Sequence, residues 1–83
     1  MAHDKNIRYD FNPGDIVRFT PAAYVVRAAP YGWANWTCVI TGRGTGWKLK
    51  GLLPGQEFDE QEFFSAKELE FDPFLTEVYR NKP

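Results

Sequence analysis

The chain has 83 residues, with ten Lys and Arg against eleven Asp and Glu, so its net charge is −1. This length suits one domain with a small core, and the balanced charge argues against a dedicated nucleic-acid binder, which is usually strongly basic. A single cysteine, Cys38, excludes an intrachain disulfide, and no apolar stretch approaches the ~20 residues of a membrane-spanning helix. No signal peptide is recognisable, so a reducing, cytoplasmic setting without a membrane is expected.

The charged residues are unevenly distributed along the chain. Residues 1–51 carry seven Lys and Arg against three Asp and Glu, a net charge of +4. Residues 52–83 carry three against eight, a net charge of −5. If the two groups lie on different faces, the molecule is dipolar, which would steer its partners without affecting its fold.

The first part of the chain predicts a flexible segment, a turn and a strand. Residues 1–11 are mostly polar and are expected to be flexible. Residues 12–15, Asn-Pro-Gly-Asp, have the composition of a turn. In the strand expected at 16–20, Val17 and Phe19 share one face. Pro21 should end this strand, because proline has no N–H for the sheet.

Residues 21–35 form a long connection that is rich in aromatic residues. We expect a short strand or an irregular excursion at 24–27 and a loop at 30–35. Two interpretations stay open for the aromatic side chains. They pack over one end of a barrel, or they form an exposed partner-binding patch, because aromatic residues near an arginine are typical of binding hot spots. The residues of this patch are Tyr24, Arg27, Tyr31 and Trp33.

The clearest element is a β-hairpin over 36–53. Apolar residues alternate with other residues on both sides of the Gly-rich turn at 42–46, as in a half-buried strand pair. The glycines would allow positive φ at several turn positions. The expected core residues are Trp36, Cys38, Ile40, Trp47 and Leu49. The outer face carries an alternative, nucleic-acid-binding site, whose basic residues would contact phosphates: Arg43, Lys48 and Lys50.

The last third of the chain predicts short elements. The acidic segment 56–61 should be a hydrated loop and 62–64 a short strand. Residues 65–68, Ser-Ala-Lys-Glu, have the form of a capping box for a single helical turn, which leads into a last strand at 69–71. Residues 73–83 are either a tail that orders on a partner or a short helix. The apolar stripe of that helix would consist of Phe74 or Leu75 with Val78 and Tyr79.

This order of elements over 12–72 resembles the SH3-like small barrels. The shared features are a Gly-Asp before the first strand, a long loop, a central hairpin and a one-turn helical step before the final strand. The resemblance implies an all-β fold, a small SH3-like barrel of about five antiparallel strands, with a possible short C-terminal helix. The Val-Arg-Phe-x-Pro opening also resembles small accessory subunits of electron-transfer complexes. The acids of a peptide-binding SH3 loop are missing, so no functional residue is carried over.

No catalytic, metal or cofactor site is recognisable in the sequence. Cys38 falls in the inward set of a central strand, and the only histidine, His3, is near the terminus, so no nucleophile–base pair is expected. The acidic run at 57–62 lacks the spacing of a calcium loop, and 42–46 lacks a phosphate-binding motif.

We therefore expect a non-catalytic protein-interaction module without a cofactor. It would be an accessory subunit, or a small regulator or inhibitor, that docks on a larger protein partner. Its acidic segment could mimic a polyanion, by analogy with compact virus-encoded inhibitors. Nucleic-acid binding through the hairpin is the alternative. The sequence identifies neither the partner nor the oligomeric state.

Overall fold

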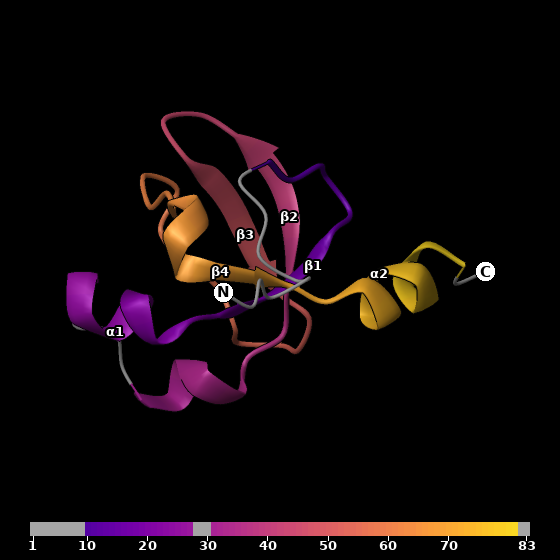
Figure 1. The fold of residues 1–83 in the computed structure, drawn as a ribbon, viewed down its shortest axis with the longest axis horizontal. Helices are drawn as coiled ribbons and strands as arrows, with labels where there is room; N and C mark the ends of the chain where they lie inside the picture. The colour runs from indigo at the N-terminus through magenta and orange to yellow at the C-terminus, as the bar shows by residue number, and fades with distance from the viewer. Residues whose placement is uncertain (1–9, 28–30, 82–83) are drawn as a thin grey trace, which may run out of the picture.

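A computed structural model of the chain contains a four-stranded antiparallel sheet with the strand order β3-β2-β1-β4 (Figure 1). It describes residues 10–27 and 31–81, with the backbone only for Val26, Arg27, Tyr31 and Ala34. The strands are β1 (Ile16–Phe19), β2 (Cys38–Arg43), β3 (Trp47–Gly51) and β4 (Leu69–Phe71). The helices are α1 (Pro21–Arg27) and α2 (Pro73–Arg80), and the 3₁₀ turns are η1 (Tyr31–Asn35) and η2 (Ala66–Glu68).

The antiparallel sheet and the short C-terminal helix confirm the coarse prediction. The described residues contain four strands, and the expected strand at 62–64 is present only as an isolated bridge between Phe64 and Trp47. Each of these two residues donates its backbone N–H to the carbonyl oxygen of the other, at 2.9 and 3.0 Å. On the other side of Phe64 the chain turns at once into η2, whose N-cap is Ser65.

The predicted hairpin is confirmed as β2 and β3. Cys38 lies opposite Gly51 and Ile40 opposite Leu49, with an irregularity in register between Ile40 and Gly42. The expectation of positive φ at the turn is wrong, because among the described glycines only Gly14 and Gly55 have it. A Cβ at Gly46 would lie 2.6 Å from the carbonyl oxygen of Phe64. Glycine is therefore needed here for the close approach of the bridge.

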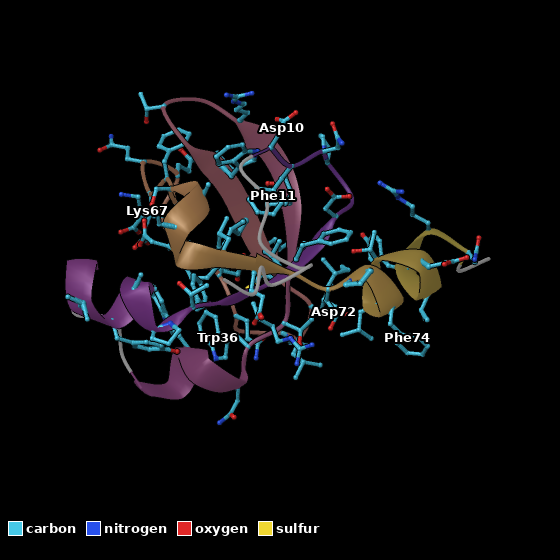
Figure 2. All side chains as sticks on the ribbon, viewed as in Figure 1. Asp10, Phe11, Trp36, Lys67, Asp72 and Phe74 are labelled. Carbon is cyan, nitrogen blue, oxygen red and sulfur yellow. The ribbon has the colours of Figure 1, made fainter. Side chains whose placement is uncertain are left out.

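The core lies on one face of the sheet and contains most of the predicted residues. Cys38, Ile40, Trp47 and Leu49 are buried, and Trp36 is half-buried against them. Phe11, in the segment expected to be flexible, is also a core residue (Figure 2). Its ring meets Trp47 edge to face at 5.2 Å, and its carbonyl oxygen accepts the indole N–H at 3.2 Å.

The described parts of the connection from β1 to β2 are the helix α1 and the 3₁₀ turn η1, which corrects the strand or irregular excursion expected at 24–27 and the loop expected over 31–35. Pro30, the first residue of that expected loop, lies outside the described residues. Pro21 takes the first position of α1, where the missing N–H costs nothing. The N–H of Ala23 donates to the carbonyl oxygen of Thr20 at 3.0 Å. The Thr20 hydroxyl in turn donates to the carbonyl oxygen of Lys67 at 2.6 Å, which ties α1 to η2.

The end of the chain follows the prediction more closely. The backbone N–H and hydroxyl of Ser65 both donate to Glu68 Oε1 at 3.0 Å, so the predicted capping box is confirmed. β4 then pairs with β1, with Arg18 opposite Glu70. This pairing places α2 beside the start of β1. No helix in the described ranges is long and apolar enough to cross a membrane.

Candidate protein-interaction surface

The start of α2 is fixed by Asp72, which is the N-cap of the helix. Its Oδ1 accepts the N–H of Leu75 at 2.8 Å, and its Oδ2 pairs with the guanidinium of Arg18. Its own N–H donates to the carbonyl oxygen of Ile16 at 2.8 Å. Pro73 follows as the first helical residue, a position that proline favours. Residues 72–73 therefore join the end of the sheet to the helix with a defined direction.

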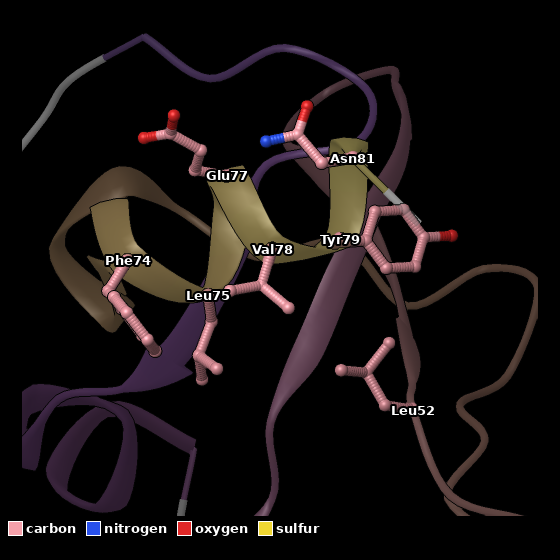
Figure 3. A pocket seen from close by; sticks show the side chains of 7 residues that line it. All are labelled: Leu52, Phe74, Leu75, Glu77, Val78, Tyr79 and Asn81. Atoms are coloured by element: carbon pink, nitrogen blue, oxygen red, sulfur yellow. The ribbon is translucent and has the colours of Figure 1, made fainter. Parts of the chain in front are cut away.

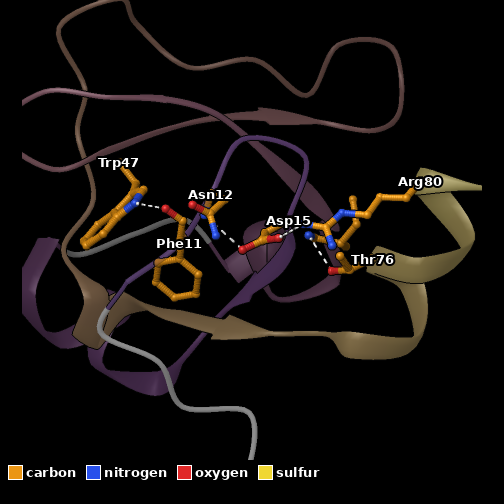
Figure 4. Close-up of polar contacts among 7 residues, drawn as sticks. Phe11, Asn12, Asp15, Trp47, Thr76 and Arg80 are labelled. Carbon is orange, nitrogen blue, oxygen red and sulfur yellow. Dashed lines mark hydrogen bonds and ion pairs between the residues drawn. The ribbon is translucent and has the colours of Figure 1, made fainter.

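Polar side chains hold the rest of α2 against the sheet (Figure 4). The hydroxyl of Thr76, which is 3% exposed, accepts the N–H of Ile16 at 2.8 Å. One turn later, Arg80 Nη2 donates to Asp15 Oδ1 at 2.9 Å. The Asp15 carboxylate is 1% exposed, and its Oδ2 also accepts the N–H of Asn12 at 3.0 Å. The inward face of this helix is thus polar and hydrogen-bonded.

The apolar stripe of α2 is exposed as a consequence. Phe74 is 73% exposed, Val78 51% and Tyr79 40%, and Leu75 is half-buried. The Phe74 side chain extends away from the body of the molecule (Figure 2). In Figure 3, Phe74, Leu75 and Val78 point away from Glu77 and towards the side where Leu52 lies. An amphipathic helix normally turns its apolar stripe to the core, so α2 has the reverse orientation.

The turn after β3 continues this apolar surface. Leu52 and Leu53 are 42% and 64% exposed. A groove of about 720 Å³ lies between Leu52 and α2, with Glu77 and Asn81 as its polar lining residues (Figure 3). An adjoining hollow shares Leu52 and Leu75 and reaches Thr37. We call this continuous apolar surface the α2–Leu52 face. It consists of Leu52, Leu53, Phe74, Leu75, Val78 and Tyr79.

The structure places Trp33 and Tyr24 partly inside. Both are half-buried and packed against the core. The ring of Trp33 stacks on Phe19 at 5.0 Å and meets Phe58 edge to face, also at 5.0 Å. The side chains of Arg27 and Tyr31 lie outside the described part. This geometry favours the interpretation in which the aromatic side chains pack against the core. A partner-binding role for Tyr24, Arg27, Tyr31 and Trp33 stays a prediction.

Trp33→Ala tests the two interpretations of the aromatic connection. An exposed contact residue could be removed with no loss of folding. We instead expect a loss of about 1–3 kcal/mol in unfolding free energy, because the ring contacts of Trp33 with Phe19, Trp36, Phe58 and Phe64 disappear. Equilibrium urea denaturation measures the change. An unchanged denaturation midpoint would instead support the interpretation that Trp33 is an exposed partner-binding residue.

Two of the three basic residues proposed on the hairpin have contacts within the chain. The Arg43 guanidinium lies 4.9 Å from the centre of the Trp47 ring and 3.6 Å from Asp10 Oδ1. Lys48 donates to the carbonyl oxygen of Glu60 and lies over the Phe63 ring. Lys50 is exposed. Nucleic-acid binding through Arg43, Lys48 and Lys50 therefore stays a prediction without a geometric observation in its favour.

Acidic and basic residues also meet on one side of the hairpin. A single hollow of about 230 Å³ is lined by basic and acidic residues together, among them Lys48, Lys50, Glu57, Asp59 and Glu60. Residues of the two charge groups therefore share one surface here, so the condition for a dipolar molecule is not met on this side of the hairpin. Mixed charge at close range weakens the field of either sign.

Two kinds of chemical site can be checked among the described residues: a reactive cysteine and a cluster of metal ligands. Cys38 is fully buried, and its burial raises the pKa of the thiol to about 12, so the reactive thiolate is absent near neutral pH. Within residues 10–27 and 31–81, no three His, Cys, Asp or Glu side chains are grouped as metal ligands. His3 lies outside the described residues.

No protein-family model, curated protein or solved structure matches this chain. Its function is therefore argued from its own geometry. The sequence indicated the stripe on α2, and the alternation in the hairpin placed Leu52 on the outer face with Lys48 and Lys50. Neither pattern indicated that these two groups would meet in one groove.

Proposed function

We propose that this protein is a non-catalytic protein-interaction module and that it binds its partner through the α2–Leu52 face. The observation that carries this proposal is the reversed orientation of α2. Its apolar stripe faces water although the chain has a core that could have received it. Apolar surface that stays in water loses the stabilising free energy of burial, about 25 cal/mol per Å². A contiguous exposed apolar patch is typical of a protein-binding site.

The anchoring of α2 adds a second argument. Asp72, Thr76 and Arg80 fix the helix at its start, middle and end. A surface held in one conformation before binding loses less entropy when a partner arrives. These polar contacts support a role in which α2 is presented in a fixed orientation.

We also propose that the fold is an SH3-like small barrel. The strand order β3-β2-β1-β4 and the η2 turn before β4 support this proposal. The Phe64 bridge adds to it, because it lies in the place of the strand expected between β3 and β4. Such a domain suits the role of an accessory subunit or a small regulator.

Site-specific photo-crosslinking tests the proposed surface. We expect a benzoylphenylalanine at position 78 to give a discrete polypeptide adduct in cells that produce the protein. The same group at position 25 is the control, because Val25 on α1 is 85% exposed. Excess wild-type protein should compete the adduct away, and a Phe74→Glu variant should not. Equal labelling from positions 78 and 25, or no adduct at position 78, would contradict the proposal.

A further inference from the structure

We infer that the α2–Leu52 face binds a second copy of this chain, with the two α2 helices antiparallel about a two-fold axis. This inference rests on the proposed function, because it names the occupant of the surface proposed there. It follows from three features of the face: the spacing of its apolar residues, its shape and the position of its charges.

The spacing of the apolar residues on α2 is symmetrical. The midpoint of α2 lies between residues 76 and 77. Phe74 and Tyr79 are equally far from this midpoint on its two sides, and so are Leu75 and Val78. In an antiparallel pair, Phe74 of one copy lies opposite Tyr79 of the other, and Leu75 lies opposite Val78. Aromatic residues therefore meet aromatic residues, and aliphatic residues meet aliphatic ones. A two-fold interface needs such a self-complementary patch, because both copies contribute the same surface.

The shape of the face is also self-complementary. α2 projects from the side of the sheet (Figure 1), and the groove of about 720 Å³ runs alongside it. The same rotation places the helix of each copy over the groove of the other. Phe74, which is 73% exposed, then comes next to Tyr79 and Leu52 of the second copy, both of which line that groove. The most exposed aromatic side chain of α2 would thus be covered.

The charges of α2 permit this contact. Glu77 lines the groove, but its side chain points away from Leu52 (Figure 3), which places its carboxylate at the solvent rim when the apolar stripes pair. Arg80 remains bonded to Asp15. Pairing therefore buries apolar side chains without burying an unpaired charge, which would oppose association.

The area of the face predicts a weak dimer. Exposed apolar patches of this kind cover about 300–600 Å², so two copies would bury about 600–1,200 Å² in total. Stable complexes bury about 1,200–2,000 Å². We therefore expect a reversible dimer with a dissociation constant of about 10–100 µM, which is monomeric when dilute.

Sedimentation of the purified chain tests the dimer. Between about 1 µM and about 1 mM, the weight-average mass should rise from one chain towards two. Val78→Glu should raise the dissociation constant at least about tenfold, and Val25→Glu, the matched control on α1, should leave it unchanged. Far-UV circular dichroism confirms that both variants are folded. A monomer throughout this range, or a Val78→Glu variant that associates like the wild type, would overturn the inference.

Disulfide trapping tests the antiparallel arrangement. Leu75→Cys and Val78→Cys chains are mixed and mildly oxidised, while Cys38 is too buried to compete. We expect the mixed disulfide to exceed both homodimers by about threefold or more, because positions 75 and 78 lie opposite each other, whereas like positions are offset by three residues, about 4.5 Å, along the axis. A predominant Val78→Cys homodimer would contradict this arrangement.

The two proposals can fail separately. If the chain stays monomeric but position 78 captures a different polypeptide, the dimer is wrong and the interaction surface stands. If the chain stays monomeric and position 78 yields no adduct, both proposals are wrong. An adduct of twice the chain mass, in which position 78 of one copy is joined to α2 of a second copy, supports both.

Discussion

Phe64→Ala should cost about 3–5 kcal/mol in unfolding free energy, the range for a buried phenylalanine. Phe64 is fully buried, and its ring lies 5.1 Å from that of Phe58 and 5.3 Å from that of Phe19. A domain of this size is stable by about 4–12 kcal/mol, so the variant would lose a large share of its stability. The loss includes the cavity that the missing ring leaves behind.

Equilibrium urea denaturation followed by tryptophan fluorescence measures the effect of Phe64→Ala. Phe74→Ala is the matched control, because the same atoms are removed from a side chain that is 73% exposed. We expect the control to change stability by no more than about 0.5 kcal/mol. A loss below about 1 kcal/mol for Phe64→Ala would show that residues 63–64 contribute little to the core.

Asp15→Ala should cost about 2–4 kcal/mol, although Asp15 is a charged residue in a turn. Its carboxylate is 1% exposed and accepts hydrogen bonds from the N–H of Asn12 and from Arg80. Removal leaves a part-buried N–H without its acceptor and releases the end of α2. Asp10→Ala is the matched control, because the Asp10 side chain is 80% exposed and its pairing with Arg43 is worth little.

Amide hydrogen exchange locates the effect of Asp15→Ala within the fold. We expect exchange in the last turn of α2 to accelerate more than exchange in the β2–β3 hairpin. The hairpin has its own ladder of hydrogen bonds, whereas the end of α2 depends on the contact between Arg80 and Asp15. Uniform acceleration across the domain would mean that Asp15 acts on global stability alone.

Local signals predicted the hairpin and the capped turn correctly. Period-two alternation in Cys38–Ile40 and Trp47–Leu49 acts between neighbours in sequence, so a short window contains it. The Ser65–Glu68 capping box spans only four residues. The burial of Cys38, Ile40, Trp47 and Leu49 followed from the same alternation, whereas the burial of Val39 on the opposite face did not.

Predictions failed where a residue has two possible local roles. Pro21 is compatible with the end of a strand and with the first turn of a helix. In the structure it begins the helix α1. This helix buries Ala23 completely, and Thr20, just before it, donates a hydrogen bond to the carbonyl oxygen of Lys67. The glycines at 44 and 46 have a similar ambiguity. Gly46 is explained by the nearby backbone of Phe64, 18 residues away in the chain, and not by positive φ.

The sequence by itself determined that residues 73–80 can form an amphipathic helix, with a capping Asp72, a Pro73 at the first position and an apolar stripe. Only the tertiary structure decided which way that stripe faces. Thr76 and Arg80 find their partners at Ile16 and Asp15, 60 and 65 residues away in the chain. Because these hydrogen bonds need the polar side of α2 to face the sheet, the apolar side faces the solvent. A pattern of residues cannot show this choice, since it depends on acceptors and donors that the fold brings from the other end of the chain.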